Sequence, residues 1–220
     1  YRSLMNSRVI LVSDDRSSLR SPDTLLWPDA ACMRGIHTGE WTAHIFEYAM
    51  SFEGNMTQVR ELAAANGVGV LHPHGALATD PPGLIVCDVD STVTRTEAID
   101  LLAECAGKAD EVREITARAM VGELDFTQSL YARVRCLEGL HIGALEEAWK
   151  ATVITPGTAE LVAAAHDVGA AVGLVSGGFT AIVDPLAEQI RADFAASNEL
   201  EIVDNHLTGR VVGDIIDRAA

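Results

Sequence analysis

The chain has 220 residues, of which 48% are apolar, so it is long enough for one large domain or for a medium-sized domain with a smaller companion. It carries 32 acidic and 16 basic residues, a formal net charge of −16, which argues against nucleic acid and against an anionic membrane surface as partners. No apolar run is long enough to span a membrane, and the four cysteines form no CxxC pair, so we expect reduced thiols in a cytoplasmic protein.

Residues 1–80 predict a small α+β domain. Strands are expected at 7–14, 42–52 and 68–72, and a helix at 56–67. A break that contains proline and glycine, at 77–83, separates this unit from the rest of the chain. Its strand–helix–strand pattern is loosely similar to ligand-sensing and dimerisation modules, which leaves a regulatory role and a homodimer open.

Residues 81–220 change to alternating strands and helices. Buried strands are predicted at 83–88 and 170–176, helical stretches at about 97–150, helices at 155–169 and 179–190, and a hairpin at 199–213. The strand at 83–88 is continuously apolar, which is typical of a parallel sheet covered by helices on both faces. We therefore predict an α/β core with a Rossmann-like parallel sheet.

Some of these elements carry explicit end signals. Thr155 and Pro156 predict the N-cap and the first residue of the helix at 155–169. Pro185 is predicted either to interrupt the helix at 179–190 or to mark its start. Asp204 and Asn205 predict a tight turn within the hairpin.

An acid pair, Asp88 and Asp90, follows the first buried strand of this region. Side chains two apart in a strand point to the same side, so the two carboxylates are expected to converge where ligands bind in α/β sheets. Such a pair repels unless a cation or a shared proton relieves it, and Mg²⁺ is the natural cation because it takes oxygen ligands together with phosphate oxygens. The alternative is a pair of solvated turn aspartates.

Ser176 closes the second buried strand and precedes two glycines, Gly177 and Gly178. A hydroxyl and free backbone N–H groups at the start of a helix suit a phosphate group. The alternative is a glycine turn with a capping serine. The two strand ends together are more specific than either one alone.

A helical segment at 126–137 places an arginine on its apolar face. Four residues form the apolar stripe: Phe126, Leu130, Val134 and Leu137. At about 100° per residue, Arg133 lies about 20° from Phe126, whereas Arg135 points to the opposite side. Arg133 has no acid at helical spacing nearby, so either it binds an anion from elsewhere or it extends its stem over the edge of the core.

Four motifs of the second region point to a known family. They are DVDSTVTRTE (88–97), AMVGELDFTQSL (119–130), VSGGF (175–179) and LTGRVVGDIID (207–217). Together they resemble the phosphoserine phosphatases of the haloacid dehalogenase superfamily, over about two thirds of the chain. The resemblance implies a core of the haloacid dehalogenase type, with the helices of 97–150 forming a cap that excludes water from the site.

The resemblance also implies roles for individual residues. Asp88 would be the nucleophile that forms an aspartyl-phosphate, and Asp90 would protonate the leaving serine hydroxyl and then activate water. Mg²⁺ would be held by the Asp88 carboxylate and the Asp90 backbone carbonyl. Ser176 and the Gly177 amide would hold phosphate oxygens.

The expected substrate, O-phospho-L-serine, also carries an ammonium and a carboxylate. Glu97 can bind the ammonium, and Arg133 can bind the carboxylate through two hydrogen bonds. By resemblance, Phe126 and Met120 would be the apolar walls. The alternative for Glu97 is an acid in the first turn of a helix, where the helix dipole favours it.

The family pattern continues with a lysine that contacts the phosphate and a GDGxND loop that completes the metal site. The chain ends at Ala220, and we assign residues 213–217, which begin like that loop, to the hairpin segment. We therefore expect a segment of a longer enzyme that is weakly active or inactive alone.

The sequence is compatible with three functions. The first is Mg²⁺-dependent hydrolysis of O-phospho-L-serine to L-serine and phosphate, the last step of serine biosynthesis. The second is a phosphatase for another small phosphomonoester, whose substrate would leave Glu97 and Arg133 unpaired. The third is a non-catalytic amino-acid-binding or regulatory protein.

Overall fold

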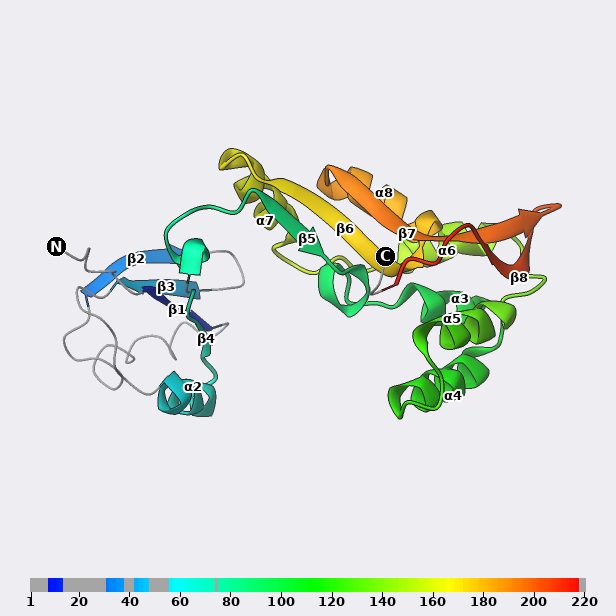
Figure 1. Cartoon of the computed structure of the whole chain (residues 1–220), viewed down its shortest axis with the longest axis horizontal. Coiled ribbons are helices and arrows are strands. Elements are labelled where there is room, and N and C mark those ends of the chain that lie inside the picture. Colours follow the sequence, from blue (N-terminus) through cyan, green and yellow to red (C-terminus); the bar gives the residue numbers. More distant parts are fainter. Residues whose placement is uncertain (1–7, 14–30, 38–41, 48–55, 74, 218–220) are drawn as a thin grey trace. The chain divides into compact units, whose positions relative to one another are not determined.

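The computed structural model describes residues 8–13, 31–37, 42–47, 56–73 and 75–217. These residues belong to two compact units that divide between Pro81 and Pro82 (Figure 1). Each unit contains its own four-stranded sheet.

The first unit is an antiparallel sheet with one α-helix and one short 3-10 helix, η1 (Gly75–Ala78), among its described residues. Its elements are β1 (Arg8–Ser13), β2 (Ala31–His37), β3 (Thr42–Glu47), α2 (Met56–Ala65) and β4 (Gly69–Leu71), with the strand order β2-β3-β1-β4. The predicted strands and helix of this unit are therefore present, although residues 48–52 lie outside the described part. The strand β2 is not predicted, because a register irregularity between Cys32 and Arg34 breaks its alternation.

The second unit is an α/β core, as predicted. Its strands are β5 (Leu84–Cys87), β6 (Ala171–Phe179), β7 (Phe194–Val203) and β8 (His206–Val212), in that order across the sheet. The first three are parallel, and β8 returns antiparallel to β7. The turn residues Asp204 and Asn205 have φ values of 48° and 60°, as the predicted tight hairpin turn requires.

Two helices, α7 (Thr158–Asp167) and α8 (Thr180–Ile190), pack on one face of this sheet. Buried side chains of both helices contact Val172 and Leu174 of β6. On β5, by contrast, Leu84 and Val86 are each 53% exposed. Among the described residues, helices therefore cover one face of β5, whereas its apolar sequence predicts cover on both.

The predicted start of α7 is wrong. The N-cap is Gly157, with a φ of 92°, and not Thr155. Thr155 instead holds the turn that follows β5, because its Oγ1 donates to the Thr92 carbonyl at 2.8 Å. The helix α8 also continues through Pro185, which neither interrupts it nor marks its start.

A helical cap lies between β5 and β6. Its helices are α3 (Ala98–Cys105), α4 (Ala109–Met120), α5 (Phe126–Arg135) and α6 (Gly143–Ala151). Buried residues of all four helices share one apolar cluster with Phe179, Ile182, Leu200 and Leu207 of the core. The cap is therefore packed on α8 and the β7–β8 hairpin.

Backbone hydrogen bonds fix the cap to the core at two places. Where the chain enters and leaves the cap, Thr94 and Ile154 form an antiparallel bridge, and Arg95 N–H donates to the Val153 carbonyl at 2.7 Å. On the other side, the loop before α6 pairs with the hairpin, and Gly139 N–H donates to the Leu207 carbonyl at 2.8 Å. These bonds set where the cap helices stand over the sheet.

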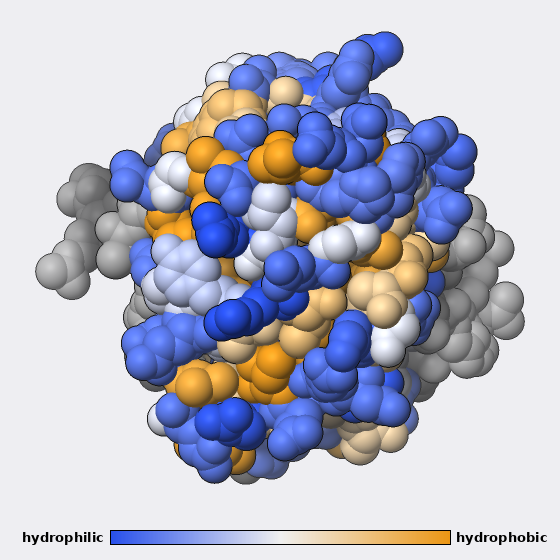
Figure 2. Space-filling view, turned by 90° about the vertical axis from the view of Figure 1, so that its right-hand side faces the viewer, coloured by the Kyte–Doolittle hydropathy of each residue, from blue (hydrophilic) through white to orange (hydrophobic). Residues whose placement is uncertain are grey.

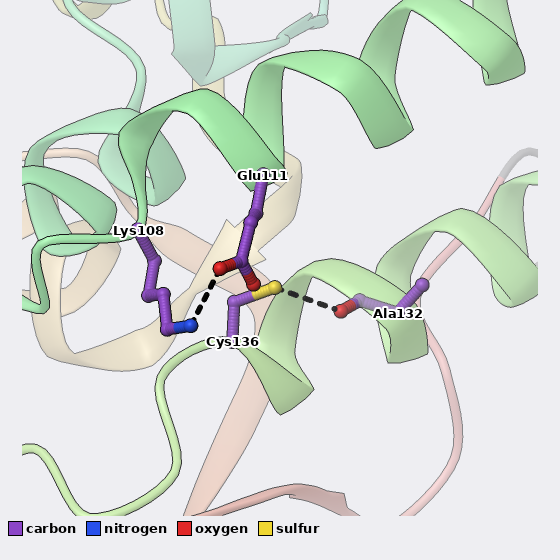
Figure 3. A network of polar contacts seen from close by, with 4 residues as sticks. All are labelled: Lys108, Glu111, Ala132 and Cys136. Carbon is purple, nitrogen blue, oxygen red and sulfur yellow. Dashed lines mark hydrogen bonds and ion pairs between the residues drawn. The ribbon is translucent and has the colours of Figure 1, made fainter.

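One cap thiol lies in a polar network (Figure 3). Lys108 Nζ contacts Glu111 Oε1 at 2.5 Å, and the Cys136 thiol donates to the Ala132 carbonyl at 3.4 Å. Burial raises the pKa of Cys136, and the Glu111 charge raises it further. Both effects disfavour the thiolate form, which is the reactive form of a cysteine.

The surface is mostly hydrophilic where Figure 2 shows it. Figure 2 shows hydrophilic residues over most of one end of the molecule, with apolar residues between them. Within the described ranges, no helix combines the length and the apolar character that crossing a bilayer needs.

Candidate active site

Two strand ends of the core sheet bring the predicted residues together. Asp88 follows β5 directly, and Ser176, Gly177 and Gly178 belong to the last part of β6. The two strands are parallel neighbours, with Cys87 opposite Leu174. Their carboxyl ends therefore meet at the edge where α/β sheets bind ligands.

A tight turn follows β5 and separates the two aspartates. The strand ends at Cys87, so Asp88 and Asp90 are not both strand residues, and their convergence comes from the turn at Val89–Val93. Ser91 has a φ of 57°, in the left-handed region, and Thr94 N–H closes the turn on the Val89 carbonyl at 2.9 Å. The turn leaves Asp88 exposed and Asp90 half-buried.

Asp88 is held by one contact from within the turn. Thr92 Oγ1 donates to Asp88 Oδ2 at 3.2 Å. The carboxylate is otherwise open to the cavity, which Asp88 lines. An accessible carboxylate at this position can act as a nucleophile or as a metal ligand.

Asp90 is held at both oxygens. Its Oδ1 accepts from Ala98 N–H at 2.9 Å, and its Oδ2 accepts from Ser176 Oγ at 3.2 Å. Burial raises the pKa of Asp90, the Glu97 and Asp88 charges add to this, and the two hydrogen bonds oppose it. A carboxyl that is fixed beside a second carboxyl and keeps its proton to higher pH is suited to general acid–base work.

The two glycines leave room that any side chain would fill. A Cβ on Gly177 would lie 2.7 Å from the Phe126 ring of the cap, and one on Gly178 would lie 2.6 Å from Asp90 Oδ2. Gly178 N–H also donates to Ser176 Oγ at 2.8 Å. The cap and the acid pair therefore approach the backbone of β6 closely.

A cavity of about 240 Å³ lies between these groups and the cap. It is lined by Asp88, Asp90, Glu97, Ile99, Phe126, Leu130, Arg133, Gly177, Gly178 and Phe179. Its volume is below the roughly 300–1,000 Å³ of sites for drug-sized ligands, which favours a small substrate.

The helix α5 supplies the cap side of the cavity. Asp125 caps it, accepting from Gln128 N–H at 2.7 Å, while Gln128 Oε1 accepts from Asp125 N–H at 3.1 Å. Arg133 lines the cavity with Phe126, as the helical spacing predicts, while Arg135 is exposed.

Arg133 is a half-buried cation. Its Nε donates to the Ser129 carbonyl at 3.3 Å, and it forms no ion pair with any carboxylate in the part of the chain that the structure describes. Burial lowers the pKa of Arg133, an effect that the charges of Glu97, Asp100 and Asp90 oppose. A half-buried guanidinium with free donors favours an anionic ligand.

Glu97 faces the same cavity from the residue before α3. Its Oε1 accepts from Ser91 Oγ at 2.9 Å. It is not ion-paired with Arg133 or with any other described cation. The cavity therefore holds opposite charges at separate positions.

Two predicted residues do not line the cavity. Met120 ends α4 and is 83% exposed, and Ser176 is buried behind the glycines. Four residues that line the cavity were not among the predicted site residues: Ile99, Leu130, Gly178 and Phe179. Gly178 could have been predicted from the sequence, because it belongs to the same Ser-Gly-Gly motif as Ser176 and Gly177.

The donor set for Mg²⁺ is partial. Asp88 and Asp90 supply hard oxygen donors, which suit this ion. No group of three or more His, Cys, Asp or Glu residues is arranged for a metal ion within the described ranges. Two carboxylates are compatible with Mg²⁺, since it commonly keeps several waters and binds substrate phosphate.

Comparison with known proteins gives consistent matches. A family model described as haloacid dehalogenase-like hydrolase matches residues 85–220. The phosphoserine phosphatase of Streptomyces coelicolor is 49% identical over 157 residues, 71% of this chain and 38% of that protein. The phosphoserine phosphatase of Lactococcus lactis is 45% identical over 136 residues, 62% of this chain and 63% of that protein.

A solved structure extends the similarity. The unliganded crystal structure of a probable phosphoserine phosphatase from Vibrio cholerae has a TM-score of 0.73 at 32% identity, covering 95% of this chain and 64% of that one. The chain therefore spans less than two thirds of the length of each of these three proteins.

Proposed function

The chain belongs to the haloacid dehalogenase-like hydrolases, and from this membership we propose that it hydrolyses O-phospho-L-serine to L-serine and inorganic phosphate. The proposal includes a place in serine biosynthesis, as its last step. The named relatives support it, since both curated proteins are phosphoserine phosphatases.

One observation carries the choice of substrate. Glu97 and Arg133 line one cavity with Asp88 and Asp90, and neither is neutralised by an ion pair within the described residues. In a ligand with an ammonium, a carboxylate and a phosphate, the ammonium would pair with Glu97 and the carboxylate with Arg133, while the phosphate would lie at the acid pair. A phosphomonoester without amino-acid groups would leave both charges unpaired.

In the proposed first step, Asp88 attacks phosphorus and the bond to the serine oxygen breaks. Asp90 gives its proton to that oxygen, so L-serine leaves neutral at its hydroxyl and an aspartyl-phosphate remains. The raised pKa of Asp90, caused mainly by burial, supports this role as an acid.

In the second step, Asp90 accepts a proton from water as that water attacks the aspartyl-phosphate. The bond between Asp88 and phosphorus breaks, inorganic phosphate leaves, and both carboxyl groups return to their initial states. The Gly177 amide is proposed to hold a phosphate oxygen and Phe126 to form an apolar wall, since both residues line the cavity, whereas Ser176 and Met120 do not.

Mg²⁺ is the proposed cofactor, held by Asp88 and Asp90. When bound, it would neutralise charge on the transferring phosphoryl group. Asp88 is open to the cavity, in keeping with a ligand that also contacts substrate.

A decisive experiment compares phosphate release from O-phospho-L-serine, with and without Mg²⁺, for the wild-type chain and Asp88→Asn. We expect weak metal-dependent release that the substitution abolishes, and a base-labile phosphoprotein in the wild type only. Binding of L-serine measured by calorimetry, without turnover in either protein, would instead support the non-catalytic amino-acid-binding alternative.

A further inference from the structure

Asn198 is a buried polar side chain of β7 whose contacts lead to the site. It is 1% exposed. Its Nδ2 donates to the Gly177 carbonyl at 3.0 Å and to the Ile216 carbonyl at 3.4 Å, while its Oδ1 accepts from Ile216 N–H at 2.9 Å. An amide buried this deeply is stable there only because both its donor and its acceptor are used.

The Asn198 amide replaces a backbone hydrogen-bond partner that β6 lacks, because the pairing register between β6 and β7 is broken at this point. Regular pairing stops at Val175, opposite Ala196, and resumes at Phe179, opposite Asn198. Three residues of β6 thus face a single residue of β7, Ser197, in the manner of a bulge. The Asn198 side chain supplies the donor for the Gly177 carbonyl in place of a strand N–H group.

The peptide between Gly177 and Gly178 is consequently held at both ends. Its carbonyl accepts from Asn198, and its N–H donates to Ser176 Oγ at 2.8 Å. A peptide unit is planar, so two bonds at opposite ends fix its rotation. Ser176 Oγ in turn donates to Asp90 Oδ2 at 3.2 Å, which joins Asn198 to the acid pair through one chain of hydrogen bonds.

The segment after β8 lies at the other end of this series of hydrogen bonds. Residues 213–217 follow the hairpin and are not part of it, contrary to the sequence-based assignment. In Figure 1 they run back from the hairpin toward the end of β6. There, Ile216 meets Asn198 through both of its backbone polar groups.

We propose that Asn198 is a positioning residue of the phosphoryl-transfer site: it fixes the Gly177–Gly178 peptide, and through it the Ser176 hydroxyl beside Asp90, while holding residues 213–217 against the site. This proposal rests on the proposed function for its kinetic consequences. Its geometric content stands independently, in the contacts of Asn198.

Two substitutions separate the donor from the acceptor. Asn198→Ala removes both, whereas Asn198→Asp keeps an acceptor for Ile216 N–H and turns a carboxylate toward the Gly177 carbonyl. The matched control is Ser197→Ala, since the Ser197 hydroxyl is buried without a hydrogen-bond partner in the described structure. Phosphate release is measured from pH 5 to pH 8, well below each variant's Tm.

We expect Asn198→Ala to lower kcat by about 100-fold with KM within about threefold of wild type, because small misplacements of catalytic groups have effects of this size. At pH 8, Asn198→Asp should lower kcat as much as Asn198→Ala does. At pH 5 its kcat relative to wild type should recover by about tenfold, because the buried carboxyl is then protonated and donates again. Ser197→Ala should match wild type.

Other results would overturn the proposal. If Asn198→Ala keeps kcat within threefold of Ser197→Ala, the side chain does not position the site. If the Asn198→Asp deficit is the same at every pH and follows only the loss of Tm, the role is merely structural.

A wild-type chain without turnover would bear on the proposed function and not on this inference. In that case the amide resonances of Gly177 and Gly178 provide the test. We expect both to shift in Asn198→Ala and neither to shift in Ser197→Ala, and unchanged resonances in Asn198→Ala would refute the inference.

Discussion

Replacing Arg133 tests the assignment of the substrate carboxylate most directly. Arg133→Gln keeps a polar, though shorter, side chain but removes the charge and the paired donors. In the free protein Arg133 makes one side-chain hydrogen bond, to the Ser129 carbonyl, and no ion pair within the described residues. Little native structure should therefore be lost, and relief of a half-buried charge should leave Tm unchanged or slightly higher.

The magnitude follows from what the guanidinium would bind. Truncating one partner of a buried charge pair costs about 2–5 kcal/mol, and we take the lower part, about 2–4 kcal/mol, because Arg133 is only half-buried. At about 1.4 kcal/mol for each factor of ten, kcat/KM for O-phospho-L-serine should fall by roughly 30- to 1,000-fold.

The assay uses a second substrate to isolate the carboxylate. O-phosphoethanolamine keeps the ammonium and the phosphate but lacks the carboxylate, so Arg133→Gln should change its kcat/KM by less than threefold. Arg135→Gln is the matched control, because Arg135 is exposed and does not line the cavity. Equal losses on both substrates would refute the reasoning, since Arg133 would then act on the phosphate or on the fold.

Three further changes test other parts of the site. Glu97→Gln should lower kcat/KM for O-phospho-L-serine by about 10- to 100-fold, but have little effect on 3-phosphooxypropanoate, which lacks the ammonium, in the same steady-state assay. Burial raises the pKa of Asp90, so its stabilising contribution is complete below the unfolded pKa and is lost as pH rises through the folded one. Asp90→Asn should therefore raise Tm relative to wild type more at pH 7 than at pH 3.5, and an equal difference at both would contradict this. Gly178→Ala should abolish most phosphate release, because its Cβ would lie 2.6 Å from Asp90 Oδ2, whereas Gly83→Ala, with nothing within 4 Å, should be neutral.

Periodicity predicted the cap side of the site well. The spacing of about 3.6 residues per turn that puts Arg133 beside Phe126 is a local property, so it needs no knowledge of the rest of the fold. Both residues do line the cavity. The alternating order of strands and helices likewise predicted the parallel pairing of β5 and β6. The strand β7 was predicted only from residue 199, as part of a hairpin, and its parallel pairing with β6 was not predicted.

Features that depend on distant partners were not predictable in this way. Thr155 looks like an N-cap by residue type, but its hydroxyl and N–H bond to the turn after β5, more than 60 positions away. Asn198 meets Gly177 only because β6 bulges against β7, and nothing in the spacing of either segment indicates that bulge. Residue type alone gave the wrong helix start and gave no sign of Asn198.

The site divides its tasks between two parts of the fold, and this constrains how it works. Asp88, Asp90 and the glycines belong to the sheet edge, whereas Phe126 and Arg133 belong to α5 of the cap. The cap is bonded to the core where the chain enters it, at Thr94 and Ile154, and again at the hairpin. The groups proposed for recognition are therefore held at a set place over the groups proposed for chemistry, so any loosening of either attachment should weaken substrate selection and phosphoryl transfer together.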